Sequence, residues 1–154
     1  FKLVTASAFL DILPKKWFKK FHKLNVDTKI VYFALNYNGN FKFFPKHNDD
    51  KKILNIFNKD QKSDKGIGEL AVGPDCTELI NKVFKRTHKT YVLDSTWDVH
   101  KNYEFQIYFL NFCREIIQKN KLNFDDWLKF RLKCIKEKNS RFILNNTDFL
   151  AIKK

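Results

Sequence analysis

The clearest pattern of apolar and polar positions lies over residues 14–24, which begin with Pro14, a residue tolerated at the first helical position. At about 100° per residue, aromatic and aliphatic side chains fall on one arc of a helix and lysines on the opposite arc. The apolar arc holds Trp17, Phe18, Phe21 and Leu24, and the lysine arc holds Lys15, Lys16, Lys19, Lys20 and Lys23. The pattern predicts an amphipathic helix, preceded by a short apolar helix over residues 4–13.

A second pattern predicts a β-hairpin over residues 29–44. Residues 29–37 are rich in β-branched and aromatic side chains, Asn38-Gly39 is a strong type I′ turn signal, and residues 40–44 supply a returning strand. Both faces of the first strand are apolar, which predicts a strand inside a sheet covered on both sides.

Residues 45–65 are mostly polar and charged, which predicts a long polar loop with a short helix at one apolar cluster. The remaining elements are predicted as strands over residues 66–73 and 90–93, helices over 77–86, 103–120 and from Asn123 onward, and a closing hairpin of 141–144 with 149–152. The predicted fold class is α/β mixed (α+β): a single domain with a small mixed or antiparallel sheet and about four helices.

Composition supports a folded domain with a strong positive charge. The chain has 154 residues, 44% of them hydrophobic, and 17 phenylalanines, which excludes an intrinsically disordered protein. No apolar stretch reaches the roughly 18 residues that span a bilayer. The chain contains no methionine, so we expect it to be a fragment of a larger protein. The formal net charge of +13 comes mostly from lysine, because only four of the 30 basic residues are arginine.

The cysteines indicate a reducing compartment. Cys76, Cys113 and Cys134 are widely spaced and odd in number, which is unlike a disulfide framework and favours an intracellular location, nuclear or cytoplasmic. No Cys-x-x-Cys pair indicates zinc, and the glycines at 66, 68 and 73 fit neither a phosphate-binding loop nor a dinucleotide fingerprint. We expect no metal and no cofactor.

The lysine arc of residues 14–24 is the strongest candidate for binding. Its lysines would contact successive phosphates of a nucleic acid, and Lys129, Lys133 and Lys136 would form a second patch. The same pattern also fits an anionic membrane surface, an acidic protein, or an ordinary surface helix with its lysines in water. Lysine excess is in addition typical of an AT-rich genome. Aromatics interleaved with lysine over residues 37–44 resemble single-strand binding surfaces, but no RRM consensus is present.

Catalytic residue types gather between residues 86 and 101. His88 and His100 would act as acid and base in phosphodiester cleavage, or Asp94, Asp98 and His100 would hold a divalent metal. Neither arrangement matches a known spacing, and an ordinary strand and loop explains the segment as well.

The sequence favours a non-catalytic module over an enzyme. The leading hypothesis is binding of nucleic acid, or of an assembly on nucleic acid, through lysine-rich amphipathic helices. The second is a protein-interaction domain that recognises an acidic or apolar motif, with the charge incidental. The third is a hydrolase or nuclease centred on His88, Asp94, Asp98 and His100. The oligomeric state stays open.

Overall fold

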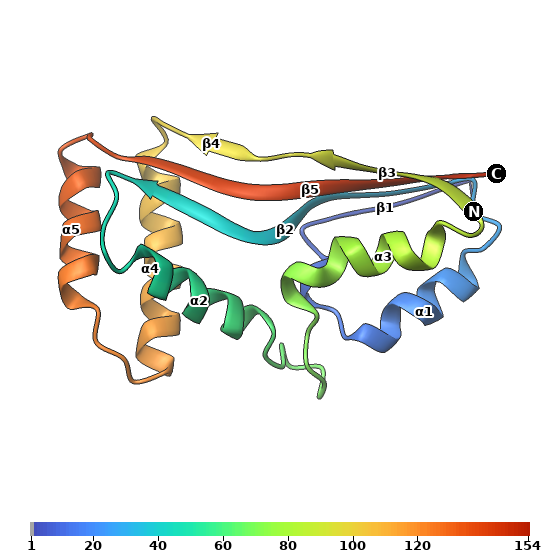
Figure 1. Cartoon of the computed structure of the whole chain (residues 1–154), viewed down its shortest axis with the longest axis horizontal. Helices are drawn as coiled ribbons and strands as arrows, with labels where there is room; N and C mark the ends of the chain where they lie inside the picture. The colour runs from blue at the N-terminus through green and yellow to red at the C-terminus, as the bar shows by residue number, and fades with distance from the viewer. Residues whose placement is uncertain (1) are drawn as a thin grey trace. The chain divides into compact units, whose positions relative to one another are not determined.

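The computed structural model describes residues 2–154. In that part of the chain it combines five α-helices with a five-stranded mixed sheet (Figure 1), which confirms the α+β class predicted from the sequence. The residues group into two compact units. Unit 1 holds the residues up to Gly39 together with Gln61–Thr96 and Asn145–Lys154, and unit 2 holds Asn40–Asp60 and Trp97–Leu144. The single domain expected from chain length stays a prediction.

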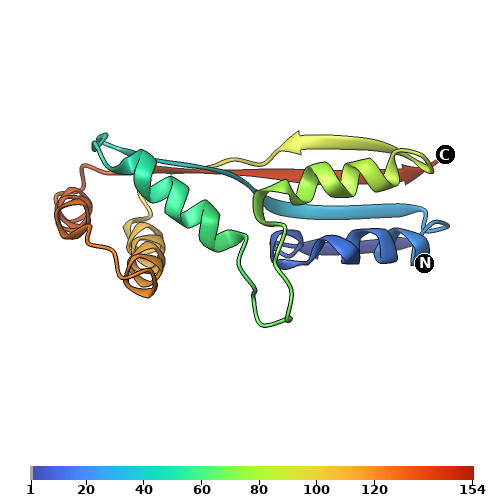
Figure 2. The same ribbon diagram turned by 60° about the horizontal axis from the view of Figure 1, so that its bottom comes forward.

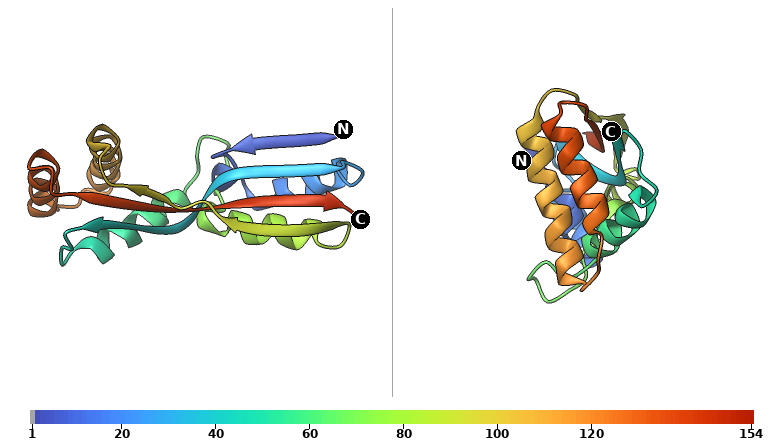
Figure 3. Two further views of the ribbon diagram at one scale, coloured as in Figure 1. Left: turned by 90° about the horizontal axis from the view of Figure 1, so that it is seen from above. Right: turned by 90° about the vertical axis from the view of Figure 1, so that its left-hand side faces the viewer.

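The sheet of unit 1 has the strand order β1-β2-β5-β3. Its strands are β1 (Leu3–Ser7), the first part of β2 (Ile30–Phe44), the last part of β5 (Arg141–Lys153) and β3 (His88–Asp94). β1 and β2 are parallel, joined by a crossover through α1, whereas β3 runs antiparallel to β5. In Figure 3 the arrows of β2 and β5 also point in opposite directions.

Two helices, α1 (Lys15–Leu24) and α3 (Cys76–Phe84), cover one face of this sheet (Figures 1 and 2). Two short 3-10 helices, η1 (Leu10–Ile12) and η2 (Gly73–Asp75), precede them. Side chains alternate between the faces of a strand, so only every second residue of each strand enters the core. The core between sheet and helices holds Leu10, Phe18, Val31, Phe33, Ile80, Phe84, Phe149 and Ala151.

Within the described residues 2–154, no helix of unit 1 lies on the other face of its sheet, so the expectation of a sheet covered on both sides is wrong for this unit. Its outward side chains include five exposed apolar residues, which we call the open face: Leu3, Ile30, Tyr91, Leu93 and Ile152. Their exposed fractions run from 36% for Tyr91 to 55% for Leu3. The inward neighbours Val31 and Phe33, by contrast, are almost fully buried.

Unit 2 is built on an aromatic core. Its elements are the ends of β2 and β5 nearest residues 44 and 141, β4 (Trp97–Val99), α2 (Asp50–Gln61), α4 (Tyr103–Lys119) and α5 (Asp125–Lys136). Figure 3 shows α4 and α5 side by side. Phe109 and Phe142 lie 4.5 Å apart between ring centroids, and Phe43 and Phe142 lie 4.6 Å apart. Such pairs add stability beyond the burial of their area.

A fully buried arginine on α5 joins three parts of unit 2. The Arg131 guanidinium donates from Nη2 to Asp50 Oδ1 at 2.5 Å and from Nη1 to the Pro45 carbonyl at 2.5 Å. The Trp127 indole donates to the same Asp50 oxygen at 2.8 Å. The guanidinium carbon also lies 5.0 Å from the centroid of the Phe43 ring. The start of α2 is thereby fixed to α5.

Both predicted hairpins are wrong. β2 runs without a break through Asn38-Gly39, and β5 runs through residues 145–148, which were expected to turn. Long-range contacts prevail over the local turn signals. The Asn36 amide donates to the Thr147 carbonyl at 3.0 Å, and Asp148 accepts a hydrogen bond from the Tyr32 hydroxyl. Tertiary pairing of this kind overrides local strand and turn preferences.

Three further predictions need correction. Residues 4–13 form β1 and η1 rather than a helix, because β1 pairs with β2 and alternates in burial. Residues 66–73 form isolated bridges and the start of η2, not a strand. The helix expected at the apolar cluster of residues 45–65 is confirmed as α2, which buries Ile53 and Phe57, but it spans three turns and so leaves no long loop in this segment.

The structure confirms four predicted helices and one predicted strand, with bounds that mostly differ by one to three residues from those predicted. These elements are the helices over residues 14–24, 77–86 and 103–120, the helix after Asn123, and the strand over 90–93. Among residues 2–154, no helix combines the length and the apolar character needed to cross a membrane.

Candidate nucleic-acid interface

Helix α1 presents two faces of opposite character, as its sequence predicts. Phe18 is 1% exposed, and the ring of Trp17 stacks on that of Phe21 with centroids 4.5 Å apart. The Phe21 ring lies 5.5 Å from Phe33 of the sheet, so the aromatic arc anchors the helix. Leu24 is the exception, because it is 74% exposed at the end of the helix.

The lysine arc of α1 points into solvent. All five lysines (Lys15, Lys16, Lys19, Lys20 and Lys23) are exposed. Within residues 2–154, only Lys16 forms an ion pair, with Glu69, and the other four have none. The eight steps from Lys15 to Lys23, at a rise of about 1.5 Å each, give the arc a length of roughly 12 Å. That length covers three or four phosphates of one nucleic-acid strand at about 3.4 Å of axis each.

The first turn of α1 is unusual in its charge. It contains no acidic residue and begins with Lys15 and Lys16. Cations at a helix N-terminus face the positive end of the helix dipole, which disfavours them by about 0.3–1 kcal/mol at exposed sites. The same arrangement raises the positive potential that an approaching phosphate meets.

A shallow hollow of about 490 Å³ opens beside this first turn. Its lining consists of Pro14, Lys15, Lys16, Lys19, Glu69 and Leu70. Leu70 is 71% exposed and gives the hollow an apolar wall. The combination of lysines with an apolar wall suits a phosphate that carries a base or another flat group.

The second predicted patch is also exposed. Lys129, Lys133 and Lys136 all face solvent on α5 in unit 2. Lys133 lies 3.9 Å from Glu137 one turn later, which partly offsets its charge. Exposed lysines occur on α2 and α3 as well, for example Lys51 and Lys82, so the lysine excess is not confined to the two patches.

His88 has a structural environment in unit 1. It is 1% exposed, its Nε2 lies 2.9 Å from the Thr28 carbonyl oxygen, and its Nδ1 lies 2.8 Å from Thr87 Oγ1. Both ring nitrogens are therefore engaged inside the core. Asp94 is six residues further along β3, about 20 Å at 3.3 Å per residue, and its Oδ1 accepts from the Thr96 amide and hydroxyl. These two candidates do not share a site.

Asp98 and His100 both lie in unit 2, where Asp98 is bound by Arg141. The Arg141 Nε donates to Asp98 Oδ1 at 2.8 Å and its Nη2 donates to Oδ2 at 2.5 Å. This hydrogen bonding, with the charges of Arg141 and nearby His100, lowers the pKa of Asp98. Of the four catalytic candidates, the structure thus brings Asp98 and His100 together, while His88 and Asp94 belong to unit 1. In residues 2–154 no three His, Cys, Asp or Glu side chains are placed to hold a metal ion.

The three cysteines are all buried free thiols in the described chain. Burial, together with the nearby charge of Asp11, raises the pKa of Cys76 to about 12. A thiol with such a pKa is protonated at neutral pH and is a poor nucleophile. The position of Cys76 at the start of α3 therefore does not activate it.

Comparison with known proteins adds no assignment. No known protein family matches the chain, and no curated protein sequence matches it significantly.

Two features of the surface have no signal in the sequence. One is the open face of unit 1, whose residues come from β1, β2, β3 and β5. The other is a pocket in unit 2 that joins the end of β2, the residue after β4 and the start of β5. Both depend on strand pairings between segments far apart in the chain, which local patterns do not reveal.

Proposed function

We propose that this chain is a non-catalytic module that binds the phosphate backbone of nucleic acid through the lysine arc of α1. The observation that supports the proposal is the arc itself: five exposed lysines on a helix whose aromatic side is anchored in the core, with one ion pair among them in the described chain. A lysine arc anchored in this way is presented to a ligand without any rearrangement of the helix. The hollow beside Lys15 and Lys19 adds a place for one phosphate group.

The test is fluorescence anisotropy with labelled single-stranded and duplex oligonucleotides across a salt series. Each phosphate contact to duplex contributes about −0.9 to the slope of log K against log salt, so three or four contacts along the arc give a slope of about −2.7 to −3.6. We expect micromolar or tighter binding near physiological salt. Binding that appears only at very low salt would show a nonspecific effect of the net charge.

A variant locates the interface. Replacement of Lys15, Lys16, Lys19 and Lys20 by glutamate should abolish binding while the circular dichroism spectrum is retained. The matched control also introduces four glutamates, so that the net charge changes equally. It replaces four exposed lysines on or directly after other helices: Lys51, Lys59, Lys82 and Lys85. Equal loss of affinity in both variants would contradict the proposal. A parallel variant of Lys129, Lys133 and Lys136 tests the second patch in the same assay.

A second candidate function is protein interaction, which the open face of unit 1 favours. Sheets usually bury an apolar face against another layer, and the covered face of this sheet is packed against helices. Three exposed lysines adjoin the open face: Lys2 and Lys29 directly precede β1 and β2, and Lys89 of β3 is paired with Ile152. An amphipathic helix with a leucine face flanked by glutamates therefore fits both its chemistry and its charge.

A designed helical peptide of this kind is the probe for the second candidate. We expect it to bind in a calorimetric titration, and we expect the double variant Leu93→Asn and Ile152→Asn to lose that binding. The control peptide carries lysine in place of each glutamate and should bind more weakly. Binding of neither peptide would contradict a protein-docking role for the open face.

A further inference from the structure

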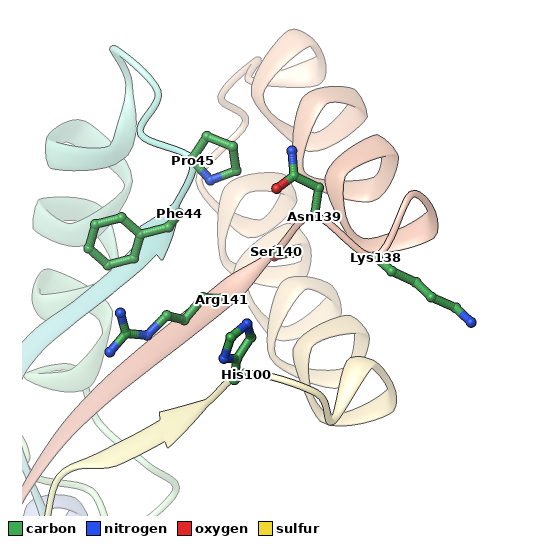
Figure 4. A pocket seen from close by; sticks show the side chains of 7 residues that line it. All are labelled: Phe44, Pro45, His100, Lys138, Asn139, Ser140 and Arg141. Atoms are coloured by element: carbon green, nitrogen blue, oxygen red, sulfur yellow. The ribbon is translucent and has the colours of Figure 1, made fainter.

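Unit 2 contains a pocket that belongs to neither lysine patch. It has a volume of about 260 Å³ and is shown in Figure 4, with lining residues Phe44, Pro45, His100, Lys138, Asn139, Ser140 and Arg141. Ligand pockets in proteins begin at about 300 Å³, so this one suits a small molecule or the end of a larger one. Its lining combines an aromatic ring with nitrogen-bearing side chains and has no carboxylate.

Arg141 is held in a fixed orientation at this pocket. Two of its nitrogens, Nε and Nη2, donate to the carboxylate of Asp98, which is not part of the lining. The third nitrogen, Nη1, has no hydrogen bond to any of residues 2–154. The guanidinium carbon lies 5.8 Å from the centroid of the Phe44 ring. The arginine therefore keeps one donor edge for a ligand beside a flat aromatic surface.

A buried amide ties together the two segments that carry His100 and Arg141. The Gln106 side chain is fully buried, and its Nε2 donates to the Val99 carbonyl at 3.0 Å and to the Ser140 carbonyl at 3.4 Å. Its Oε1 accepts from the Ser140 hydroxyl at 2.6 Å. Val99 and Ser140 directly precede His100 and Arg141, so Gln106 fixes the backbone on both sides of the pocket. Such support reduces the cost of ordering a site when its ligand binds.

We propose that this pocket binds a phosphate monoester attached to a flat ring, the chemistry of a nucleoside monophosphate. Arg141 Nη1, the His100 imidazole and the Asn139 amide supply donors for the phosphate oxygens. The ring of Phe44 stacks with the heterocycle. The ammonium of Lys138 points away from the other labelled side chains in Figure 4 and contributes only positive potential. The phosphate is carried either by a free nucleotide or by the end of a nucleic-acid strand.

The first measurement is isothermal titration calorimetry of the intact chain with AMP, adenosine and inorganic phosphate. AMP should bind at least about tenfold more tightly than either of the others, because only AMP uses both the donors and the ring. A second pair of ligands in the same titration distinguishes a free nucleotide from the end of a strand. These ligands are a short oligonucleotide with a 5′-phosphate and the same strand with a 5′-hydroxyl. Preference for the phosphorylated strand over AMP indicates a strand end, and the reverse indicates a free nucleotide.

Three single variants locate the binding. Arg141→Lys keeps the charge but loses the planar fork, and His100→Ala removes an exposed imidazole; each should weaken AMP binding about tenfold. Lys51→Gln removes an exposed lysine of α2 that lies outside the pocket and outside both lysine patches, and should leave AMP binding unchanged. If the circular dichroism spectrum shows that Arg141→Lys disturbs the fold, His100→Ala alone tests the site.

The proposal is overturned if AMP binds no more tightly than adenosine and phosphate, or if Lys51→Gln weakens AMP binding as much as Arg141→Lys does. Its failure is separate from that of the α1 interface. The variant with glutamate at positions 15, 16, 19 and 20 should lose oligonucleotide binding by α1 and keep its affinity for AMP.

Discussion

The buried ion pair between Arg131 and Asp50 offers the sharpest test of how unit 2 is held together. Replacement of Arg131 by methionine keeps most of the side-chain volume but leaves Asp50 without its counter-charge. Asp50 retains its hydrogen bonds from the Trp127 indole and the His47 amide. Removal of one partner from a buried pair costs about 3–5 kcal/mol. Because the Asp50 side chain is 28% exposed and water reaches it, we expect the lower end, about 3 kcal/mol.

The reverse change, Asp50→Asn, should cost at least as much. It leaves a charged guanidinium at 0% exposure with a neutral neighbour, and it replaces one of the two oxygens that accept from the Trp127 indole and the His47 backbone amide with an NH2 donor. In the double variant the two losses overlap, since neither charge is then left alone. We expect the double variant to lose about 2 kcal/mol less stability than the sum of the two single losses, as for residues in one network.

Urea unfolding followed by tryptophan fluorescence measures these free energies. A Trp17→Phe background confines the signal to unit 2, because the other two tryptophans, Trp97 and Trp127, both lie there. With a slope of about 1–3 kcal/mol per molar urea, a loss of 3 kcal/mol lowers the midpoint by roughly 1–3 M. Lys129→Met on the exposed side of α5 is the control and should change stability by less than about 0.5 kcal/mol. A loss below about 1 kcal/mol for Arg131→Met would refute the reasoning.

Two further predictions concern unit 1. Gly73 has φ +56°, and a Cβ at this position would lie 3.0 Å from Lys62 Cγ and 3.2 Å from the Gln61 carbonyl oxygen. Gly73→Ala should therefore lower the melting temperature clearly more than the control Gly66→Ala, whose Cβ meets open space. Similar melting temperatures for the two variants would contradict this. Burial alone would raise the pKa of Asp148, but hydrogen bonds from Tyr32 and Leu35 lower it overall. A carboxyl with a lowered folded pKa stabilises the fold above its unfolded pKa and loses this effect as pH falls through the folded pKa. Tyr32→Phe should therefore reduce stability at pH 7 and have much less effect near pH 2, and an equal effect at both pH values would count against this role.

Sequence predictions succeeded where the deciding interactions lie within one element and failed where they join residues far apart in the chain. The helix over residues 14–24 was predictable because its apolar and lysine positions repeat within one helix, and its exposed lysines follow from the same repeat. The turn signal at Asn38-Gly39 failed because the competing interaction comes from residues 147 and 148, more than a hundred positions later. β1 was mistaken for a helix because its partner β2 is not visible in a short apolar run.

The candidate sites follow the same rule. The lysine arc was predicted because it belongs to a single helix. The pocket beside Arg141 was not, because Phe44, His100 and Arg141 come together only through the pairing of β4 with β5 and the buried Gln106 amide. The segment with the most catalytic residue types was misleading for a related reason: the sequence does not reveal that His88 points into a core while His100 lines a surface pocket.

The strand order has a consequence for how the protein is made. β5 lies between β2 and β3 in the sheet, yet the ribosome synthesises it after both. Until β5 emerges, β2 and β3 have no common neighbour, and one edge of each lacks its hydrogen-bonding partner. Unpaired edges of this kind favour aggregation, and long-range pairing slows folding. Nascent chains that stop before Arg141 should therefore bind chaperones and resist solubilisation, whereas chains that extend through Lys153 should be released.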